Sequence, residues 1–282
     1  MGLPQTDVAE VAGGGGRRLA GYAGLRGWLR LHEEPVLGGA AVLVFVVGWE
    51  IVGRLGLIRP IFISSPSRIF SAARWLFAHG LWNDLAVSGT EFFDGLLLAV
   101  IVGLPAGIML GWYPRLRASF DPFVSALYST PRVALLPLLI LWLGIGVKSK
   151  IAVVFLGAIF PILVSTMAGV EAIDPNLLRC ARAFGANDRQ IFQKLALPSS
   201  LPFIISGLRL GVGRGLVGVV VGEFLASTAG IGHMMNLAAA TFQTDRTYVG
   251  ILILAAVGML LSWILERLGR RFASWRVVDE WR

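Results

Sequence analysis

Charged residues are scarce in this sequence of 282 residues. Asp, Glu, Lys and Arg make up only 15% of the chain, while apolar residues make up 56%. Soluble domains carry about 25% charged residues, so the composition argues against that class. The net charge of +8 does not indicate nucleic acid binding, because basic residues beside membrane spans are the usual topology signal.

Residues that carry chemistry are also few. The single cysteine, Cys180, excludes an internal disulfide. The three histidines (His32, His79 and His233) are too scattered to have metal-ligand spacing. No G-x-x-x-x-G-K-[ST] phosphate loop occurs, so we expect no ATPase site in this chain. We therefore expect a protein that is not an enzyme, with no catalytic residue and no bound metal or cofactor.

What the chain does have is long apolar runs, which predict an all-α integral membrane protein with about six transmembrane helices. The expected spans are residues 35–57, 86–112, 123–144, 151–170, 203–226 and 248–265. Pro131 and Pro137 should interrupt the third span, and residues 113–122 should form a short loop before it. We expect a helix over 64–76 and a single membrane domain over 35–267.

The two ends of the chain are polar. Residues 1–34 form an N-terminal tail in which 22–32 is either an amphipathic helix on the membrane surface or a disordered segment. Residues 268–282 form a basic C-terminal tail. With six spans, 15 of the 25 Lys and Arg residues fall on the side of both tails, 7 on the other side and 3 within spans. This bias predicts that both termini are cytoplasmic.

A polar segment, residues 180–202, separates the fourth and fifth spans and reads CARAFGANDRQIFQKLALPSSLP. Asn187 and Gln190 have the spacing of a capping box, which predicts a helix start. An apolar face follows it, made by Ile191, Phe192 and Leu195. Two prolines, Pro198 and Pro202, are expected to end this short helix before the next span. A short helix that offers apolar side chains at a membrane face is suited to docking into a partner.

The polar segment resembles the EAA loop of ABC importer permeases, a family pattern of Ala, then Gly, then an aliphatic-x-Leu-Pro ending. The matching residues are Ala181, Gly185, Leu195, Leu197 and Pro198, while Arg179 and Cys180 depart from the family's leading Glu and Ala. The resemblance extends over about residues 60–271. Residues 129–146 and 207–223 are similar to the branch that includes nitrate, sulfonate, taurine and bicarbonate permeases.

This resemblance implies a type I importer fold and the permease subunit of an ABC importer for a small anion, in the bacterial cytoplasmic (inner) membrane. It implies two ATPase subunits that hold ATP and Mg, a second permease copy in a homodimer, and an extracytoplasmic substrate-binding protein. Residues 171–202 become the cytoplasmic coupling loop. The residues expected to contact the ATPase are Ala181, Gly185, Ala186, Asn187, Asp188, Arg189, Ile191, Phe192, Leu197 and Pro198.

Within that set the resemblance suggests distinct roles. Ile191 and Phe192 would supply apolar anchoring, Asp188 and Arg189 would make contacts at the rim, and Gly185 would allow the turn before the helix.

Glycines recur at helical spacing in two spans. Gly103, Gly107 and Gly111 share one face of the second span, where a neighbouring backbone can approach closely. In the fifth span, glycines fall within an arc of about 80°; they are Gly207, Gly211, Gly215, Gly218 and Gly222. This second stripe is either a packing surface only or also a seam that opens during transport.

Four charged residues within predicted spans are candidates for a role in transport: Arg132, Arg209, Arg214 and Glu223. A charge at such depth costs ~2.5–3.5 kcal/mol on insertion scales, so each needs a partner or water. Arg209 and Glu223 lie ~21 Å apart along a helix and cannot pair with each other. One hypothesis is that Arg214, with Arg132, lines an anion pathway, with Arg209, Glu223, Gly211 and Gly215 as further pathway or gating candidates. The alternative is that the arginines bind carbonyls or carboxylates between helices.

Two other classes compete with an importer permease. A stand-alone secondary transporter or channel would show inverted repeats with paired broken helices. Neither the stripe of the fifth span nor the polar segment recurs in the first half of the chain. A membrane enzyme would need Ser/His or Asp pairs at span centres, and the sequence shows none.

Overall fold

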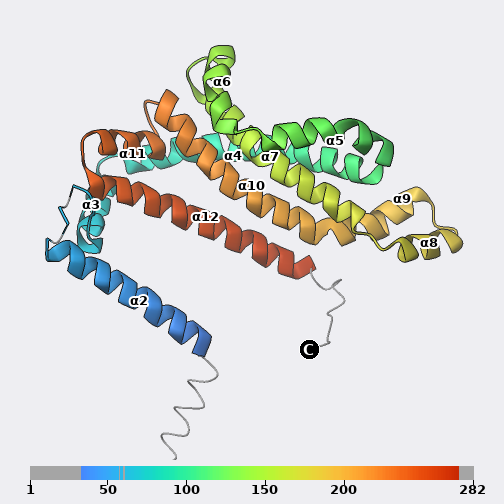
Figure 1. Ribbon diagram of the computed structural model, residues 1–282, viewed down its shortest axis with the longest axis horizontal. Helices are drawn as coiled ribbons and strands as arrows, with labels where there is room; N and C mark the ends of the chain where they lie inside the picture. Colours follow the sequence, from blue (N-terminus) through green and yellow to red (C-terminus); the bar gives the residue numbers. More distant parts are fainter. Residues whose placement is uncertain (1–32, 57, 60, 273–282) are drawn as a thin grey trace, which may run out of the picture. The chain divides into compact units, whose positions relative to one another are not determined.

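The computed structural model of the protein describes residues 33–56, 58–59 and 61–272 (Figure 1). These residues form helices and no strand, which confirms the all-α prediction for this part of the chain. The helices are α2 (Glu33–Arg54), α3 (Pro66–Ala78), α4 (Leu81–Trp112), α5 (Pro114–Ser129), η1 (Arg132–Leu135), α6 (Leu136–Leu143), α7 (Val147–Glu171), α8 (Pro175–Ala183), α9 (Asp188–Ile191), η2 (Phe192–Ala196), α10 (Leu197–Ala226), α11 (Ile231–Ala240) and α12 (Thr244–Phe272). The amphipathic helix considered over 22–32 lies outside the described residues, as do residues 273–282 of the predicted C-terminal tail.

Membrane-spanning helices account for most of this structure. Five segments are long and apolar enough to cross a membrane: Val36–Arg54, Leu81–Trp112, Val147–Glu171, Asp188–Ala226 and Thr244–Arg270. The pair α5 and η1–α6, which is bent by 89°, supplies the sixth span if it is counted as one. The predicted number of spans is confirmed on this count.

The loop predicted over residues 113–122 is wrong. Helix α5 begins at Pro114 and continues through Pro122. Proline suits the first turn of a helix because the N–H groups there have no partner within the helix. The break falls instead beside Pro131, as predicted, whereas Pro137 lies in the first turn of α6 and starts that helix.

The described residues divide into two compact units, one that ends at Ser67 and one that begins at Arg68. In the first unit, α2 exposes most of its apolar side chains, as a helix surrounded by lipid does. Glu50 forms an ion pair with Arg54 and accepts a hydrogen bond of 2.9 Å from the backbone N–H of Ser67. A carboxylate in this position caps the start of α3.

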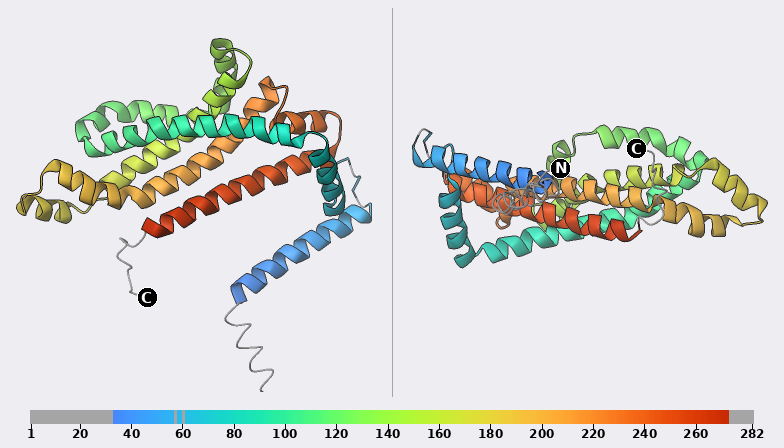
Figure 2. Two further views of the ribbon diagram at one scale, coloured as in Figure 1. Left: turned by 180° about the vertical axis from the view of Figure 1, so that it is seen from behind. Right: turned by 90° about the horizontal axis from the view of Figure 1, so that it is seen from below.

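The second unit is built around α7, which packs between α4 and α10 (Figures 1 and 2). On α4, a Cβ atom added at Gly103 would lie 3.1 Å from the carbonyl oxygen of Ile159, and one at Gly111 would lie 2.8 Å from that of Met167. The α4 glycines therefore let the α7 backbone approach closely, which confirms their predicted packing role.

The glycine stripe of α10 packs on the opposite side of α7. All five glycines are buried, and a Cβ at Gly218 would lie 3.2 Å from Cα of Val154. At Gly215 the nearest atoms belong to Phe92 of α4 and Val154 of α7, so the three helices meet there. Within one chain, the glycine stripe is therefore a helix-packing surface, as the first of the two alternatives predicted.

The polar segment runs directly into α10. The prediction that Pro198 and Pro202 end a short helix is wrong, because α9, η2 and α10 form one continuous helical stretch from Asp188 to Ala226. Pro198 lies in the first turn of α10, and Pro202 lies inside it. Proline bends a helix without necessarily ending it, and the π-helical η2 shifts the hydrogen bonds to the i→i−5 register just before the prolines.

The contact between α4 and α7 predicts a sharp difference between two glycines of one helix. A Cβ at Gly107 would lie 2.6 Å from the carbonyl oxygen of Leu163 and 2.8 Å from Cβ of Thr166, whereas one at Gly89 would meet nothing within 4 Å. We expect Gly107→Ala to lower the free energy of unfolding by about 1–3 kcal/mol through overpacking. Thermal unfolding of the purified protein in detergent measures this. Gly89→Ala, the matched control, should unfold like the parent protein, and equal loss in both variants would contradict the packing account.

Candidate functional site

The polar segment lies at one end of the α4–α7–α10 bundle, and α11 lies at the other (Figure 1). Its predicted capping box is confirmed. The side chain of Asn187 accepts a hydrogen bond from the backbone N–H of Gln190, and the side chain of Gln190 accepts one from the backbone N–H of Asn187, both of 2.9 Å. Asp174 caps α8 by accepting the backbone N–H of Asn176 at 2.8 Å. These caps stabilise the starts of α8 and α9, which form a helix–turn–helix at the end of the bundle.

The turn between α8 and α9 presents one aromatic side chain. Gly185 has a φ of +77°, a left-handed conformation that favours glycine. Phe184, immediately before it, is 92% exposed. The backbone N–H of Gly185 bonds to the carbonyl of Arg182, and that of Ala186 bonds to the carbonyl of Ala181, both at 3.0 Å. The tip therefore holds a large apolar side chain in solvent.

The expectation that Ile191 anchors a partner is wrong in this structure. Ile191 is only 2% exposed, because its side chain packs inside its own chain. Phe192 is half-buried and makes an edge-to-face contact with Trp112 of α4, with ring centroids 5.5 Å apart. These two side chains attach the segment to the bundle, and Phe184 is the aromatic side chain of the segment that stays exposed.

The remaining residues of the predicted contact set fall into two groups. Asn187, Asp188 and Arg189 are exposed around the start of α9, the geometry expected of rim contacts. Ala181 and Ala186 are half-buried, as are Leu197 and Pro198 in the first turn of α10. The contacts of all these residues with a partner stay a prediction.

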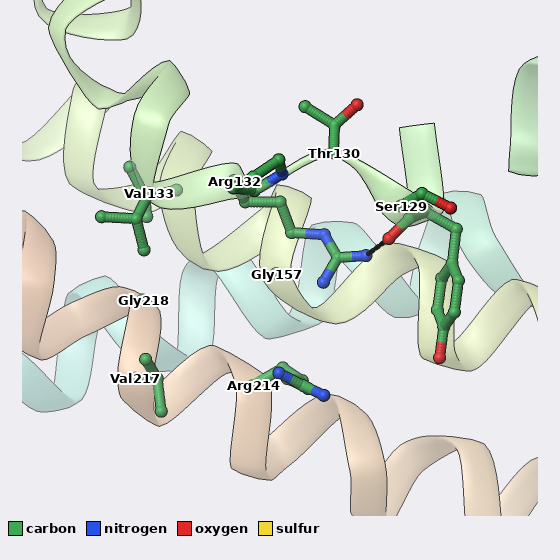
Figure 3. Close-up of a pocket in the computed structure, with 11 residues that line it drawn as sticks. Ser129, Thr130, Arg132, Val133, Gly157, Arg214, Val217 and Gly218 are labelled. Carbon is green, nitrogen blue, oxygen red and sulfur yellow. Dashed lines mark hydrogen bonds between the residues drawn. The ribbon is translucent and has the colours of Figure 1, made fainter. Parts of the chain in front are cut away.

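A second site is a cavity of about 340 Å³ beside the bend between α5 and η1, which we call the arginine pocket. Its lining residues come from four helices and the short link after α5 (Figure 3); they are Tyr128, Ser129, Thr130, Pro131, Arg132, Val133, Val153, Gly157, Arg214, Val217 and Gly218. The structure thus brings Arg132 and Arg214 together. Among the predicted pathway residues, Arg209, Glu223, Gly211 and Gly215 do not line this cavity.

Arg132 is held in place by its own surroundings. One of its terminal nitrogens donates a hydrogen bond of 2.7 Å to the carbonyl oxygen of Tyr128 (Figure 3). Its guanidinium carbon lies 5.3 Å from the ring centroid of Tyr128 and 5.6 Å from that of Phe160, within cation–π range. Its Nε is buried and has no hydrogen-bond partner in the described part of the chain.

The other predicted charges have partners elsewhere. Arg209 pairs with Glu266 of α12 at 3.6 Å, and both side chains are about half exposed. Gly211 and Gly215 are buried against neighbouring helices. For Arg209, the observed contact is the carboxylate pairing that the sequence left open as an alternative.

Glu223 belongs to a buried polar cluster at the α11 end of the bundle. Its carboxylate is completely buried, accepts a hydrogen bond of 2.6 Å from Oγ of Ser88, and accepts one of 2.5 Å from the backbone N–H of Gly232. Oγ of Ser88 in turn accepts the backbone N–H of Ile231 at 2.8 Å. The Gly230 N–H donates to Asp84 at 2.8 Å. Side chains of α4 and α10 therefore cap the start of α11, where a carboxylate is favoured by the helix dipole.

A buried ion pair completes this cluster. Lys150 of α7 pairs with Glu91 of α4, and neither side chain is more than 5% exposed. Nζ of Lys150 also donates a hydrogen bond of 2.9 Å to Oγ of Ser227, just after α10. Neither residue was among the predicted site residues: Glu91 lies within the span predicted over 86–112, and Lys150 lies just before the span predicted over 151–170. Their positions, one turn after Ser88 and one turn before Val154, put both on the packing faces of α4 and α7.

Breaking this ion pair should destabilise the protein strongly. We expect Lys150→Met to lower the free energy of unfolding by about 3–5 kcal/mol, because it leaves the buried carboxylate of Glu91 without its partner. Thermal unfolding in nanodiscs measures the effect. Adding Glu91→Gln should restore part of the loss by removing the stranded charge. Lys148→Met, two residues earlier on the same helix and exposed, is the matched control and should change little.

Comparison with known proteins supplies the context for these sites. Residues 103–274 match the family described as the binding-protein-dependent transport system inner membrane component. The chain is 35% identical to the taurine transport system permease protein TauC of Escherichia coli (strain K12) over 251 residues, covering 87% of this chain and 91% of the relative. It is 32% identical to the putative aliphatic sulfonates transport permease protein SsuC of Bacillus subtilis (strain 168), covering 97% and 95%.

Two further matches concern the range of cargoes named among the relatives and the fold. The formylaminopyrimidine transport permease protein ThiX of Halalkalibacterium halodurans is 29% identical, with 86% of this chain and 96% of the relative covered. Among solved structures, a chain of the MetNI methionine ABC transporter in inward-facing conformations superimposes with a TM-score of 0.57. That match has 23% identity and covers 70% of this chain and 96% of the other, so it bears on the fold alone.

Proposed function

The chain belongs to the family of binding-protein-dependent transport system inner membrane components, and from this membership we propose how it works as the permease subunit of an ABC importer. It is a multi-pass membrane protein with the fold of a type I importer permease. In our proposal, two ATPase subunits bind the polar segments of two permease copies. ATP and Mg would be held by those subunits and not by this chain.

The observation that carries the coupling proposal is the exposed tip of the polar segment. Phe184 is 92% exposed on a turn held by capped helices, although an isolated phenylalanine gains free energy from burial. Buried aromatic anchors dominate binding energy at many protein interfaces. A cleft in an ATPase subunit would bury this side chain, with Asp188 and Arg189 at the rim.

The same placement supports a proposal for the orientation of the protein. The polar segment and α11 lie at opposite ends of the bundle (Figure 1), and we propose that they face opposite sides of the membrane. The distribution of Lys and Arg favours a cytoplasmic location for the polar segment and for both termini. The α11 end would then face an extracytoplasmic substrate-binding protein.

We propose that the cargo is a small organic sulfonate. Two relatives that align along most of the chain carry taurine or aliphatic sulfonates in their names. The arginine pocket supports an anionic cargo, because two guanidinium groups line it and no carboxylate does. Nitrate and bicarbonate are the alternatives within the same branch.

Uptake by the reconstituted complex tests the proposal. The permease would be combined in proteoliposomes with its ATPase and binding protein, and offered taurine, ethanesulfonate, nitrate or bicarbonate. We expect uptake of the sulfonates that requires ATP. Uptake that ignores ATP would contradict the importer assignment and favour a secondary transporter, and ATP-dependent uptake of nitrate or bicarbonate alone would overturn the choice of cargo.

The coupling proposal predicts a specific defect for Phe184→Ala. Loss of this anchor should weaken binding of the ATPase by about 2 kcal/mol, or roughly 30-fold in affinity. Copurification of the ATPase and surface plasmon resonance on the nanodisc-embedded permease measure it. Phe70→Ala, which removes a phenylalanine that is 74% exposed on α3, is the matched control and should bind normally. Equal affinity for both variants would remove Phe184 from the interface.

A further inference from the structure

We propose that the arginine pocket is a binding site for an organic sulfonate with a short aliphatic chain, with the sulfonate group held by Arg132 and Arg214. The role of this site in transport rests on the proposed function. The inference goes further by choosing one site and one chemical class. Three observations support it. The positive charge of the pocket has no counter-charge among the described residues, its lining has a charged part and an apolar part, and the backbone that carries both arginines is packed against other residues.

The positive charge of the pocket has no counter-charge in the described part of the chain. None of its lining residues is acidic. Arg132 uses one nitrogen on a backbone carbonyl and keeps a buried Nε without a partner. Arg214 makes no hydrogen bond or ion pair with any described residue, whereas Arg209, five residues earlier on α10, pairs with Glu266. Arginines at membrane depth that lack a protein partner mark substrate paths or water-filled cavities.

The lining of the pocket has two chemical parts. Guanidinium groups match tetrahedral oxyanions with two parallel hydrogen bonds each, so a sulfonate with three oxygens can occupy both arginines at once. Val133, Val153 and Val217 add an apolar wall. A cavity of about 340 Å³ is near the lower end of ligand pockets, which favours a small molecule. Nitrate and bicarbonate carry no aliphatic part to cover the valines.

Both arginines sit on backbone that packing has already fixed. Arg214 lies where α10 crosses Gly157 of α7, and a Cβ atom there would approach the Arg214 carbonyl oxygen to 3.1 Å. Arg132 follows Pro131 at the bend after α5 and lies against two aromatic rings. Donors held in place before a ligand arrives lose less entropy on binding. Figure 3 shows the two side chains approaching the same space from η1 and from α10.

A cysteine in the pocket can report on this charge directly. The chain has one cysteine, so Cys180→Ser provides a background without thiols. Ser129→Cys then places a thiol in the pocket lining, beside the bend. The full-length protein in nanodiscs would react with either methanethiosulfonate-ethylsulfonate or the trimethylammonium analogue of the same size. Each reagent forms a mixed disulfide and releases methanesulfinate, so the ratio of the two rates isolates the effect of reagent charge.

We expect the sulfonate reagent to react faster, and ethanesulfonate at millimolar concentration to slow that reaction. Replacing either pocket arginine, as Arg132→Gln or Arg214→Gln, should lower the rate ratio by about tenfold, since focused positive potential concentrates anions by that order. Arg209→Gln, the matched control on the same helix, should leave the ratio unchanged. An unchanged ratio in both pocket variants, or an equal fall in the control, would overturn the site. So would a failure of ethanesulfonate to protect the thiol.

A second readout separates this site from the importer assignment. The labelling needs neither ATP nor a partner subunit, so it decides the site whatever the uptake assay shows. In the uptake assay, Arg132→Gln and Arg214→Gln should reduce sulfonate uptake at least tenfold while the ATPase still copurifies. ATP-dependent sulfonate uptake by the parent protein, with normal labelling ratios and uptake in both variants, would sustain the importer and reject the site.

Discussion

Close approach of backbones to α7 is the constraint on which the second unit depends. In lipid, helices gain little from the hydrophobic effect when they associate, so van der Waals packing and hydrogen bonds must hold them together. Glycines of α4 and α10 pack against α7, and Gly157 of α7 in turn allows the backbone of α10 to approach closely. The result is the three-helix bundle of α4, α7 and α10, and α12 packs against α10 (Figures 1 and 2).

The charged side chains inside this bundle differ in whether the chain supplies a partner for them. Glu91 forms an ion pair with Lys150, and Glu223 accepts hydrogen bonds from Oγ of Ser88 and from the backbone N–H of Gly232 in α11. Both arrangements bind helices to each other at the α11 end. Arg132 and Arg214 differ, because the described chain supplies no anion for them. A site with two positive charges and no resident counter-ion is suited to bind an anionic cargo transiently.

Much of this structure followed from spacing in the sequence. The spans, the α4 glycine face and the Asn187–Gln190 capping box depend on contacts between residues a few positions apart, and these were predicted correctly. The helix end at Pro198 and the loop over 113–122 were wrong, since proline was treated as a stop where it bends or starts a helix. Ile191 was expected in solvent and is buried, because only tertiary packing decides which face of a short helix meets the bundle. Lys150 and Glu91 are 59 positions apart, and no local pattern relates them. Their packing faces were readable, but their pairing was not.

The continuous stretch from α9 through η2 to α10 has a mechanical meaning. Asp188 at its start and Arg214 in its membrane part belong to one rod, about 39 Å apart at 1.5 Å per residue. Between them, η2 and the prolines Pro198 and Pro202 interrupt the regular α-helical hydrogen bonding. A rotation of α9 about the helix axis would therefore also rotate Arg214 in the arginine pocket, unless η2 changes its own helical twist. If η2 tightened from π to α, α9 would turn by about 100° relative to α10. The hydrogen-bond register of η2 would therefore decide whether a rotation of α9 reaches Arg214 or is absorbed before it.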